Sequence, residues 1–125
     1  MIAADSSTWI ALLEGDPGQD AKLLERALTD RQALMIPVVL TELLSGPLLS
    51  SRAAEALSQV PMIDLEPGYW QRAGLLRAKV LSMRRKARLG DALIAQTCID
   101  RDIALLTRDK DFQAFADAAE LALIL

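Results

Sequence analysis

The sequence contains no histidine. This absence excludes catalysis by Ser-His or Cys-His pairs and ribonucleases that use histidine as general acid and base. It also excludes zinc sites that are built on imidazole ligands. If the protein is an enzyme, its chemistry must therefore be carried by carboxylates, lysines, hydroxyl groups or metal-bound water.

Cysteine and aromatic residues are scarce as well. The single cysteine, Cys98, cannot form an internal disulfide or a zinc cluster, and its apolar neighbours predict a buried packing residue. A lone cysteine is compatible with a reducing compartment. Aromatic residues make up only 4% of the chain, whereas hydrophobic residues make up 52%. We therefore expect a core of aliphatic side chains.

Long apolar runs are also missing. No segment approaches the roughly 20 consecutive apolar residues that a membrane-spanning helix needs. The N-terminal residues, Met-Ile-Ala-Ala-Asp, show no basic region of the kind that begins a signal peptide. We therefore expect a soluble cytoplasmic protein that has no membrane partner. A length of 125 residues fits a single domain, residues 1–125.

Short apolar segments alternate along the chain with segments of helical periodicity. The predicted strands occupy residues 1–5, 33–36, 62–65, 103–107 and 121–125. The predicted helices occupy residues 9–13, 19–31, 38–45, 50–60, 67–88, 91–100 and 109–119, with a break at Gly90. This alternation predicts an α/β fold in which a short, mostly parallel sheet is flanked by helices. The pattern does not give the order of the strands.

Acidic residues lie where the predicted strands end and the predicted helices begin. Asp5 ends the first strand, and Asp109 comes just after Thr107 at the end of the fourth strand. Because ligands of open parallel sheets bind beyond the carboxyl ends of the strands, we expect Asp5 and Asp109 at the same edge. Glu42 lies in the helix after the second strand, and Asp91 opens a later helix. Four carboxylates can therefore converge on one pocket.

A cluster of carboxylates is stable when it holds a cation. Mg²⁺ and Mn²⁺ prefer oxygen ligands, and water bound to such an ion can attack a phosphodiester without help from histidine. Simpler interpretations stay open, because Asp91 and Asp109 can cap or support helices and Glu42 can be a solvated helix residue. Asp5 is harder to explain in this way, since an unpaired acid at the end of a buried strand is costly.

In these segments the sequence resembles the PIN-domain ribonucleases, and most closely the toxins of VapC type. The resemblance covers essentially the whole chain and is carried by residues 2–7, 40–46, 89–95 and 105–112. It implies a PIN-like three-layer fold and a Mg²⁺-dependent endoribonuclease, with Mn²⁺ able to substitute. It also implies a toxin–antitoxin pair, and hence a cognate antitoxin as partner, and a homodimer.

The same resemblance assigns roles to individual residues. It implies that the catalytic and metal-binding residues are Asp5, Glu42, Asp91 and Asp109. Asp111 is an alternative fourth acid, and we prefer Asp109 because it is nearer to the strand end. Further candidates are Thr107, which we expect to orient a carboxylate or a water, and Ser6 next to the first acid.

Positive charge is concentrated in one segment, although the net charge of the chain is −3. Residues 67–90 contain seven basic side chains and no acid, so the rest of the chain carries a net charge of −10. On one continuous helix Arg77, Arg84 and Arg88 share a flank. We expect this flank to bind RNA phosphates beside the metal site. An acidic segment of a partner protein is an alternative ligand, and the helix dipole explains part of the pattern.

Leucines are crowded into the first 50 residues. The set comprises Leu12, Leu13, Leu23, Leu24, Leu40, Leu43, Leu44, Leu48 and Leu49. We expect some of them to form a groove for an antitoxin helix or a dimer surface, since large exposed apolar patches mark interfaces. Alternatively, neighbouring helices simply bury them.

Two other functions remain in view. One is a catalytically silent interaction module with the same fold. The other is a receiver-like phosphoacceptor domain, which fits poorly because serines rather than a second acid follow Asp5.

Overall fold

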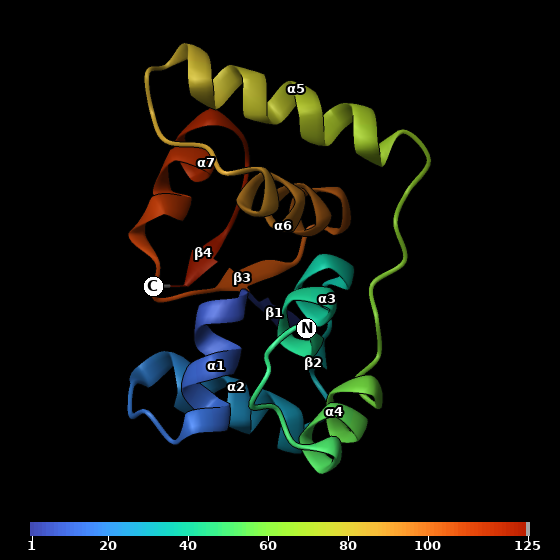
Figure 1. Ribbon diagram of the computed structural model, residues 1–125. Coiled ribbons are helices and arrows are strands. Elements are labelled where there is room, and N and C mark those ends of the chain that lie inside the picture. The colour runs from blue at the N-terminus through green and yellow to red at the C-terminus, as the bar shows by residue number, and fades with distance from the viewer. Residues whose placement is uncertain (125) are drawn as a thin grey trace.

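The computed structural model describes residues 1–124, and a parallel sheet lies at its centre (Figure 1). The strand order is β2-β1-β3-β4, and the strands are β1 (Ile2–Ala4), β2 (Ala33–Leu34), β3 (Ala104–Leu106) and β4 (Leu123–Ile124). Leu105 and Leu106 point to opposite faces of the sheet, and both are fully buried. Because both faces are covered, each strand consists of an unbroken apolar run.

The helices form the two outer layers. Helices α1 (Ser6–Glu14) and α2 (Gln19–Thr29) connect β1 to β2. Between β2 and β3 lie α3 (Pro37–Leu44), α4 (Ser51–Ser58), α5 (Tyr69–Ser82) and α6 (Leu89–Arg101). The 3₁₀ turn η1 (Lys110–Phe112) and α7 (Gln113–Ala118) connect β3 to β4. In Figure 1, helices α5, α6 and α7 lie on the opposite side of the sheet from α1 and α2. The expected three-layer α/β fold is confirmed.

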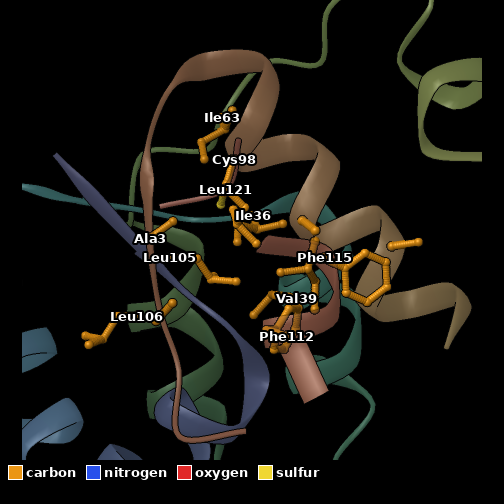
Figure 2. Packing of buried hydrophobic residues seen from close by; sticks show 14 of the residues in the cluster. Ala3, Ile36, Val39, Ile63, Cys98, Leu105, Leu106, Phe112, Phe115 and Leu121 are labelled. Atoms are coloured by element: carbon orange, nitrogen blue, oxygen red, sulfur yellow. The ribbon is translucent and has the colours of Figure 1, made fainter. Parts of the chain in front are cut away.

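The core is largely aliphatic, as the composition predicts. Val39 of α3, Leu105 of β3 and Phe115 of α7 are fully buried in one cluster (Figure 2). Cys98 of α6 belongs to the same cluster and has no exposed surface. Burial raises the pKa of its thiol to about 12. The prediction that Cys98 is a packing residue is therefore confirmed.

The strand predicted at residues 62–65 is wrong. A single bridge joins Met62 to Met35, and the backbone hydrogen bonds of Met35 go to Pro61 and Ile63. Because α3 begins at Pro37, the neighbouring strand ends too early for a longer ladder to form. The last predicted strand is present as β4, and its final residue, 125, lies outside the described residues.

The long helix predicted at residues 67–88 is also shorter than expected. It ends at Ser82, and Arg84 adopts a left-handed conformation with φ of 59°. Residues 83–88 form a loop that turns Ala87 inward, and Arg77 Nε donates a hydrogen bond to the Ala87 carbonyl at 2.8 Å. Arg77, Arg84 and Arg88 therefore share no helix flank, and that part of the prediction is wrong.

The start of α6 corrects another expectation. The helix begins at Leu89, so Gly90 lies in its first turn rather than before it. Asp91 is consequently the third residue of the helix and not its N-cap, which is Arg88. Similarly, α1 begins at Ser6, three residues before the predicted start, and Asp5 caps it. Within residues 1–124, no helix combines the length and apolarity that crossing a membrane requires.

The leucines of the first 50 residues are mostly accounted for by packing. Leu24 and Leu43 are buried. Four more pack partly against the core, namely Leu12, Leu23, Leu40 and Leu49. Only Leu13, Leu44 and Leu48 of the set are exposed. The larger exposed side chains of α5, including Trp70 and Leu75, were not part of that expectation.

Candidate metal centre

The candidate site lies at the carboxyl ends of β1 and β3. From β1 the chain passes to β2 on one side, whereas β3 is the neighbour on the other side. Such a reversal in strand order opens a crevice where parallel sheets bind ligands. Ala4 pairs with Leu106, so the register of the two strands places Asp5 beside Thr107.

Asp5 is buried and held by several hydrogen bonds. Thr107 Oγ1 donates to its Oδ2 at 2.7 Å, and the backbone N–H of Thr8 donates to its Oδ1 at 3.2 Å. Ser7 Oγ lies 2.8 Å and 2.9 Å from the two carboxylate oxygens. Burial raises the pKa of Asp5, and these three hydrogen bonds only partly oppose that effect. The carboxylate is thus fixed in orientation, but burial makes its ionised form energetically unfavourable.

Three further acids lie close together at the same edge. Carboxylate oxygens of Asp91, Asp109 and Asp111 all fall within 4.8 Å of one another. Asp109 is also tied to β3, because its N–H donates to Thr107 Oγ1 at 2.9 Å. Its Oδ1 accepts from the N–H of Asp111 at 2.9 Å, so it caps the 3₁₀ turn. The capping interpretation of Asp109 is therefore correct, but capping does not account for the close group.

The charges of these acids act on one another. The pKa of Asp91 is raised to about 6, mainly by burial and then by the charge of Asp109. Asp5 and Asp111 raise it further, whereas Arg88 lowers it. The four aspartates therefore form one electrostatic unit, in which a bound cation would relieve the repulsion.

Glu42 is not among the charges that act on Asp91. Its side chain is exposed on α3, and it is not a member of the close acidic group found among the described residues. Ser6 Oγ is buried without a hydrogen-bond partner in the described part of the chain. Thr107, by contrast, has the contacts expected of an orienting residue, because its hydroxyl bridges Asp5 and Asp109.

Two cations from the basic segment reach the acidic group. Lys86 Nζ lies 3.1 Å from Asp111 Oδ2, and Arg88 Nη2 lies 3.9 Å from the same oxygen. Other members of the segment are engaged elsewhere: Arg72 with Asp100, Lys79 with the Ala118 carbonyl and Arg85 with Asp117. Lys86 and Arg88 are therefore the basic residues best placed to act at this site.

The donor set fits a hard divalent cation. The ligand atoms available are carboxylate and hydroxyl oxygens, and the only thiol of the chain is buried in the core. Mg²⁺ and Mn²⁺ take oxygen ligands of this kind, whereas zinc sites usually include sulfur or imidazole. The arrangement can thus hold a metal next to the positive charge of Lys86 and Arg88.

Sequence reasoning named the four aspartates but overlooked some of their neighbours. Ser7 lies only two residues after Asp5, so its hydroxyl was a visible candidate for a contact with that acid. Lys86 was not identified because residues 67–88 were predicted to form one continuous helix. Asp20, which is buried, and Arg108, which is exposed, form an ion pair described below, and no local pattern connects residues 88 positions apart.

Comparison with known proteins gives a consistent family and fold. The profile of the PIN domain family matches residues 2–118. No curated protein sequence matches the chain.

Several solved structures resemble this one. A chain of VapBC2 from Rickettsia felis bound to a promoter DNA fragment has a TM-score of 0.75 and 21% identity, over 99% of this chain and 98% of that one. A chain of VapBC-5 from Mycobacterium tuberculosis has a TM-score of 0.71 and 21% identity, over 98% and 96%. A chain of FitAcB from Neisseria gonorrhoeae has a TM-score of 0.72 and 19% identity, over 100% and 97%. At these identities the likeness shows a shared fold.

Proposed function

Because the chain belongs to the PIN domain family, we propose that it is a metal-dependent endoribonuclease, the toxin of a VapC-type toxin–antitoxin pair. The observation that carries this proposal is the unit of four aspartates at the switch point of the sheet, in which the pKa of Asp91 is raised to about 6. Carboxylates are crowded in this way at sites that bind cations, and the protein offers no histidine for another route of phosphodiester hydrolysis.

Asp5, Asp91 and Asp109 are proposed to hold Mg²⁺, or Mn²⁺ in its place. The ion, when bound, would neutralise charge on the scissile phosphate and lower the pKa of a water nucleophile. Thr107 keeps Asp5 and Asp109 in fixed orientations. Asp111 lies in the same close group and remains an alternative to Asp109 as the fourth acid. Glu42 remains a candidate on the resemblance alone.

RNA is the proposed substrate, and its phosphates are proposed to contact the basic residues beside the acids. Lys86 and Arg88 flank the group through Asp111, and Arg84 is exposed nearby in the same loop. Arg77 supports this loop through the Ala87 carbonyl. Their positions support the proposal, because a phosphate backbone that approached the carboxylates would meet this positive charge.

A cognate antitoxin is the proposed protein partner in the cytoplasm. The solved structures of similar fold include VapBC complexes, one of them described as a member of a family of toxin–antitoxin systems. A basic side chain of such a partner could neutralise the aspartates and exclude the metal. We also propose a homodimer, for which the exposed apolar side chains of α5 are the natural contact.

The function is tested with Asp5→Asn and Asp91→Asn. Each variant should lose Mg²⁺-dependent RNA cleavage and bind Mn²⁺ far more weakly by isothermal titration calorimetry, while circular dichroism shows an intact fold. Asparagine keeps the shape of the side chain but removes the charge that holds the ion. Asp117→Asn, which changes an exposed acid of α7 paired with Arg85, should keep both activities.

The same measurements separate the alternatives. Near-full cleavage by Asp5→Asn or Asp91→Asn would remove that residue from the site. A wild-type protein that neither binds Mn²⁺ nor cleaves RNA would instead be a non-catalytic module with the PIN fold.

A further inference from the structure

Arg108 lies between two residues of the site but points away from it. The chain is extended here, so Thr107 and Asp109 face the acidic unit and the side chain of Arg108 faces the connection between α1 and α2. Its Nε and Nη2 donate to the two carboxylate oxygens of Asp20, both at 2.8 Å, and its Nη1 donates to Asp16 at 2.8 Å. Such a two-pronged pair is both strong and specific in direction.

Asp20 links this arginine to the helix that begins at the site. Its side chain is buried, and its Oδ2 also accepts a hydrogen bond from Thr8 Oγ1 at 2.9 Å. The hydrogen bonds from Arg108 lower the pKa of Asp20 to about 2, so the ion pair persists throughout the neutral range. Thr8 is fully buried, and its backbone N–H donates to Asp5.

The contacts close a ring around the two strand ends. On the inner side, Thr107 joins Asp5 to the backbone of Asp109. On the outer side, the series Thr8, Asp20 and Arg108 joins the same two segments a second time. The β1–β3 ladder joins the two strands as far as Asp5, whose N–H donates to the Leu106 carbonyl at 3.2 Å. Beyond that point, the two side-chain links hold the segments from opposite sides of the backbone.

Gly18 leaves space for the ion pair between Asp20 and Arg108. A Cβ atom at Gly18 would lie 2.6 Å from Asp20 Oδ1 and 2.7 Å from Arg108 Nη2. The φ of Gly18 is 170°, which is ordinary extended backbone, so a side chain here would not strain the backbone but would push the Asp20 and Arg108 side chains apart.

We propose that Arg108 is a positioning residue, which acts through Asp20 and Thr8 to hold Asp5 and Asp109 at the separation that binds the divalent cation. The proposal rests on the proposed function, since it concerns the same metal site. The physical reason is that Asp5 and Asp109 repel each other, and the ring resists the separation that this repulsion favours. Arg108 itself touches none of the reacting groups.

The test replaces Arg108 by lysine, which keeps the charge but cannot form the two-pronged pair. Arg108→Lys should bind Mn²⁺ at least tenfold more weakly by calorimetry, the usual scale for residues that support metal ligands. The melting temperature of each protein in EDTA measures the structural cost separately. In RNA cleavage, the Mg²⁺ concentration for half-maximal rate should rise, and saturating Mg²⁺ should restore most of the rate.

A matched control exists on the other side of the molecule. Arg72 forms the same kind of pair with Asp100, through Nε at 3.0 Å and Nη2 at 2.6 Å. The Asp100 side chain is 9% exposed, as is that of Asp20. Asp100 lies nine residues beyond Asp91 along α6, roughly 13 Å at the rise of an α-helix. Arg72→Lys should lower the melting temperature similarly and change the affinity for Mn²⁺ less than twofold.

A second pair of variants covers the case in which Arg108→Lys does not fold. Thr8→Val removes the hydroxyl that contacts Asp20 and keeps the shape, whereas Thr8→Ser keeps the hydroxyl. Thr8→Val should weaken Mn²⁺ binding, and Thr8→Ser should retain it within about twofold.

Three outcomes overturn the proposal. One is wild-type affinity for Mn²⁺ in folded Arg108→Lys or Thr8→Val, and in that case the proposed nuclease function stands. Another is an equal loss of affinity in Arg72→Lys, which would reduce the effect to general stability. The third is a wild-type protein that binds no Mn²⁺ and cleaves no RNA, which would remove the proposed function and the positioning role together.

Discussion

Asp91 is the residue on which the charges of the site converge. Its carboxylate is half-buried in the first turn of α6, and burial and the neighbouring acids raise its pKa from 3.8 to about 6. The folded protein therefore holds a proton that the unfolded chain releases at a lower pH. The contribution of Asp91 to the stability of the metal-free protein should therefore fall as the pH rises from about 4 to about 6, and the loss should persist above that range.

Asp91→Asn should consequently stabilise the metal-free protein at neutral pH. Asparagine does not titrate, so the gain in unfolding free energy over wild type should be small near pH 4 and grow to on the order of 1–3 kcal/mol at pH 7.5. Urea denaturation in EDTA at several pH values measures this difference. With Mg²⁺ present the order should reverse, because the ion stabilises only a protein that binds it.

Asp117→Asn is the matched control for this prediction. The hydrogen bond from Arg85 lowers the pKa of Asp117, so its charge favours folding above the unfolded pKa and the benefit is lost at low pH. The same substitution should therefore cost stability at neutral pH instead of adding to it. If the gain in stability of Asp91→Asn did not change with pH, the pKa of Asp91 would not be raised in the folded protein.

The predictability of the site also differs from residue to residue. Asp5 and Asp109 could be placed together from the sequence because each follows a buried parallel strand, and strand ends share an edge. Asp91 was found, although in the wrong position of its helix. Asp20 and Arg108 could not be found, since their pairing depends on how α2 packs against the end of β3. The residues on either side of Asp20 and Arg108 in the sequence give no indication of this contact.

At the scale of elements, the boundary of α5 changes how the basic segment works. The sequence from residue 67 to residue 88 has helical spacing throughout, and only Arg84, in a left-handed conformation, marks the turn. No glycine or proline stands there to indicate it. The loop turns Lys86 and Arg88 toward Asp111, while Arg85 points to Asp117 on α7. The positive charge that faces the site thus comes from a loop and not from a helix flank.

Removing the charges of this loop should weaken RNA binding in a salt-dependent way. For Lys86→Gln combined with Arg88→Gln, the slope of log affinity against log salt should fall in magnitude by about 1.4 for single-stranded RNA, or about 0.7 per phosphate contact. Asp5→Asn can serve as the background, so that cleavage does not interfere. Fluorescence anisotropy with a labelled RNA at several salt concentrations measures the slope.

Arg85→Gln supplies the comparison, because it removes the same charge from the same loop on the side that faces α7. Its slope should stay close to that of wild type. If Arg85→Gln changed the slope by about half as much as the double variant, net charge, and not position beside the acids, would govern RNA binding.

At the scale of the whole molecule, α5 is covered on one side only. Its inner side chains pack on α6 and α7, whereas Trp70 is 65% exposed and Leu81 is 47% exposed. At 100° per residue, Trp70, Gly74, Ala78 and Leu81 fall within about 80° of one another. A Cβ at Gly74 would meet nothing within 4 Å, so the stripe is open at its middle. It is a surface that a second copy of the chain can cover.

The exposed stripe of α5 leads to the last prediction, that the isolated protein is a dimer at tens of micromolar. A stable dimer buries about 800 Å² per subunit, roughly a tenth of the 7281 Å² of surface described here. Sedimentation velocity should show the dimer, and Trp70→Glu combined with Leu81→Glu should shift it to monomer, because the carboxylates cannot be buried unpaired. Leu48→Glu changes a side chain that is 96% exposed in a turn outside the stripe, and it should leave the dimer intact. Trp9, the only other tryptophan, is already buried, so a blue shift of fluorescence with rising concentration would report the covering of Trp70. A wild-type monomer at these concentrations, or a dimer that survives both glutamates, would show that the stripe is not a dimer contact.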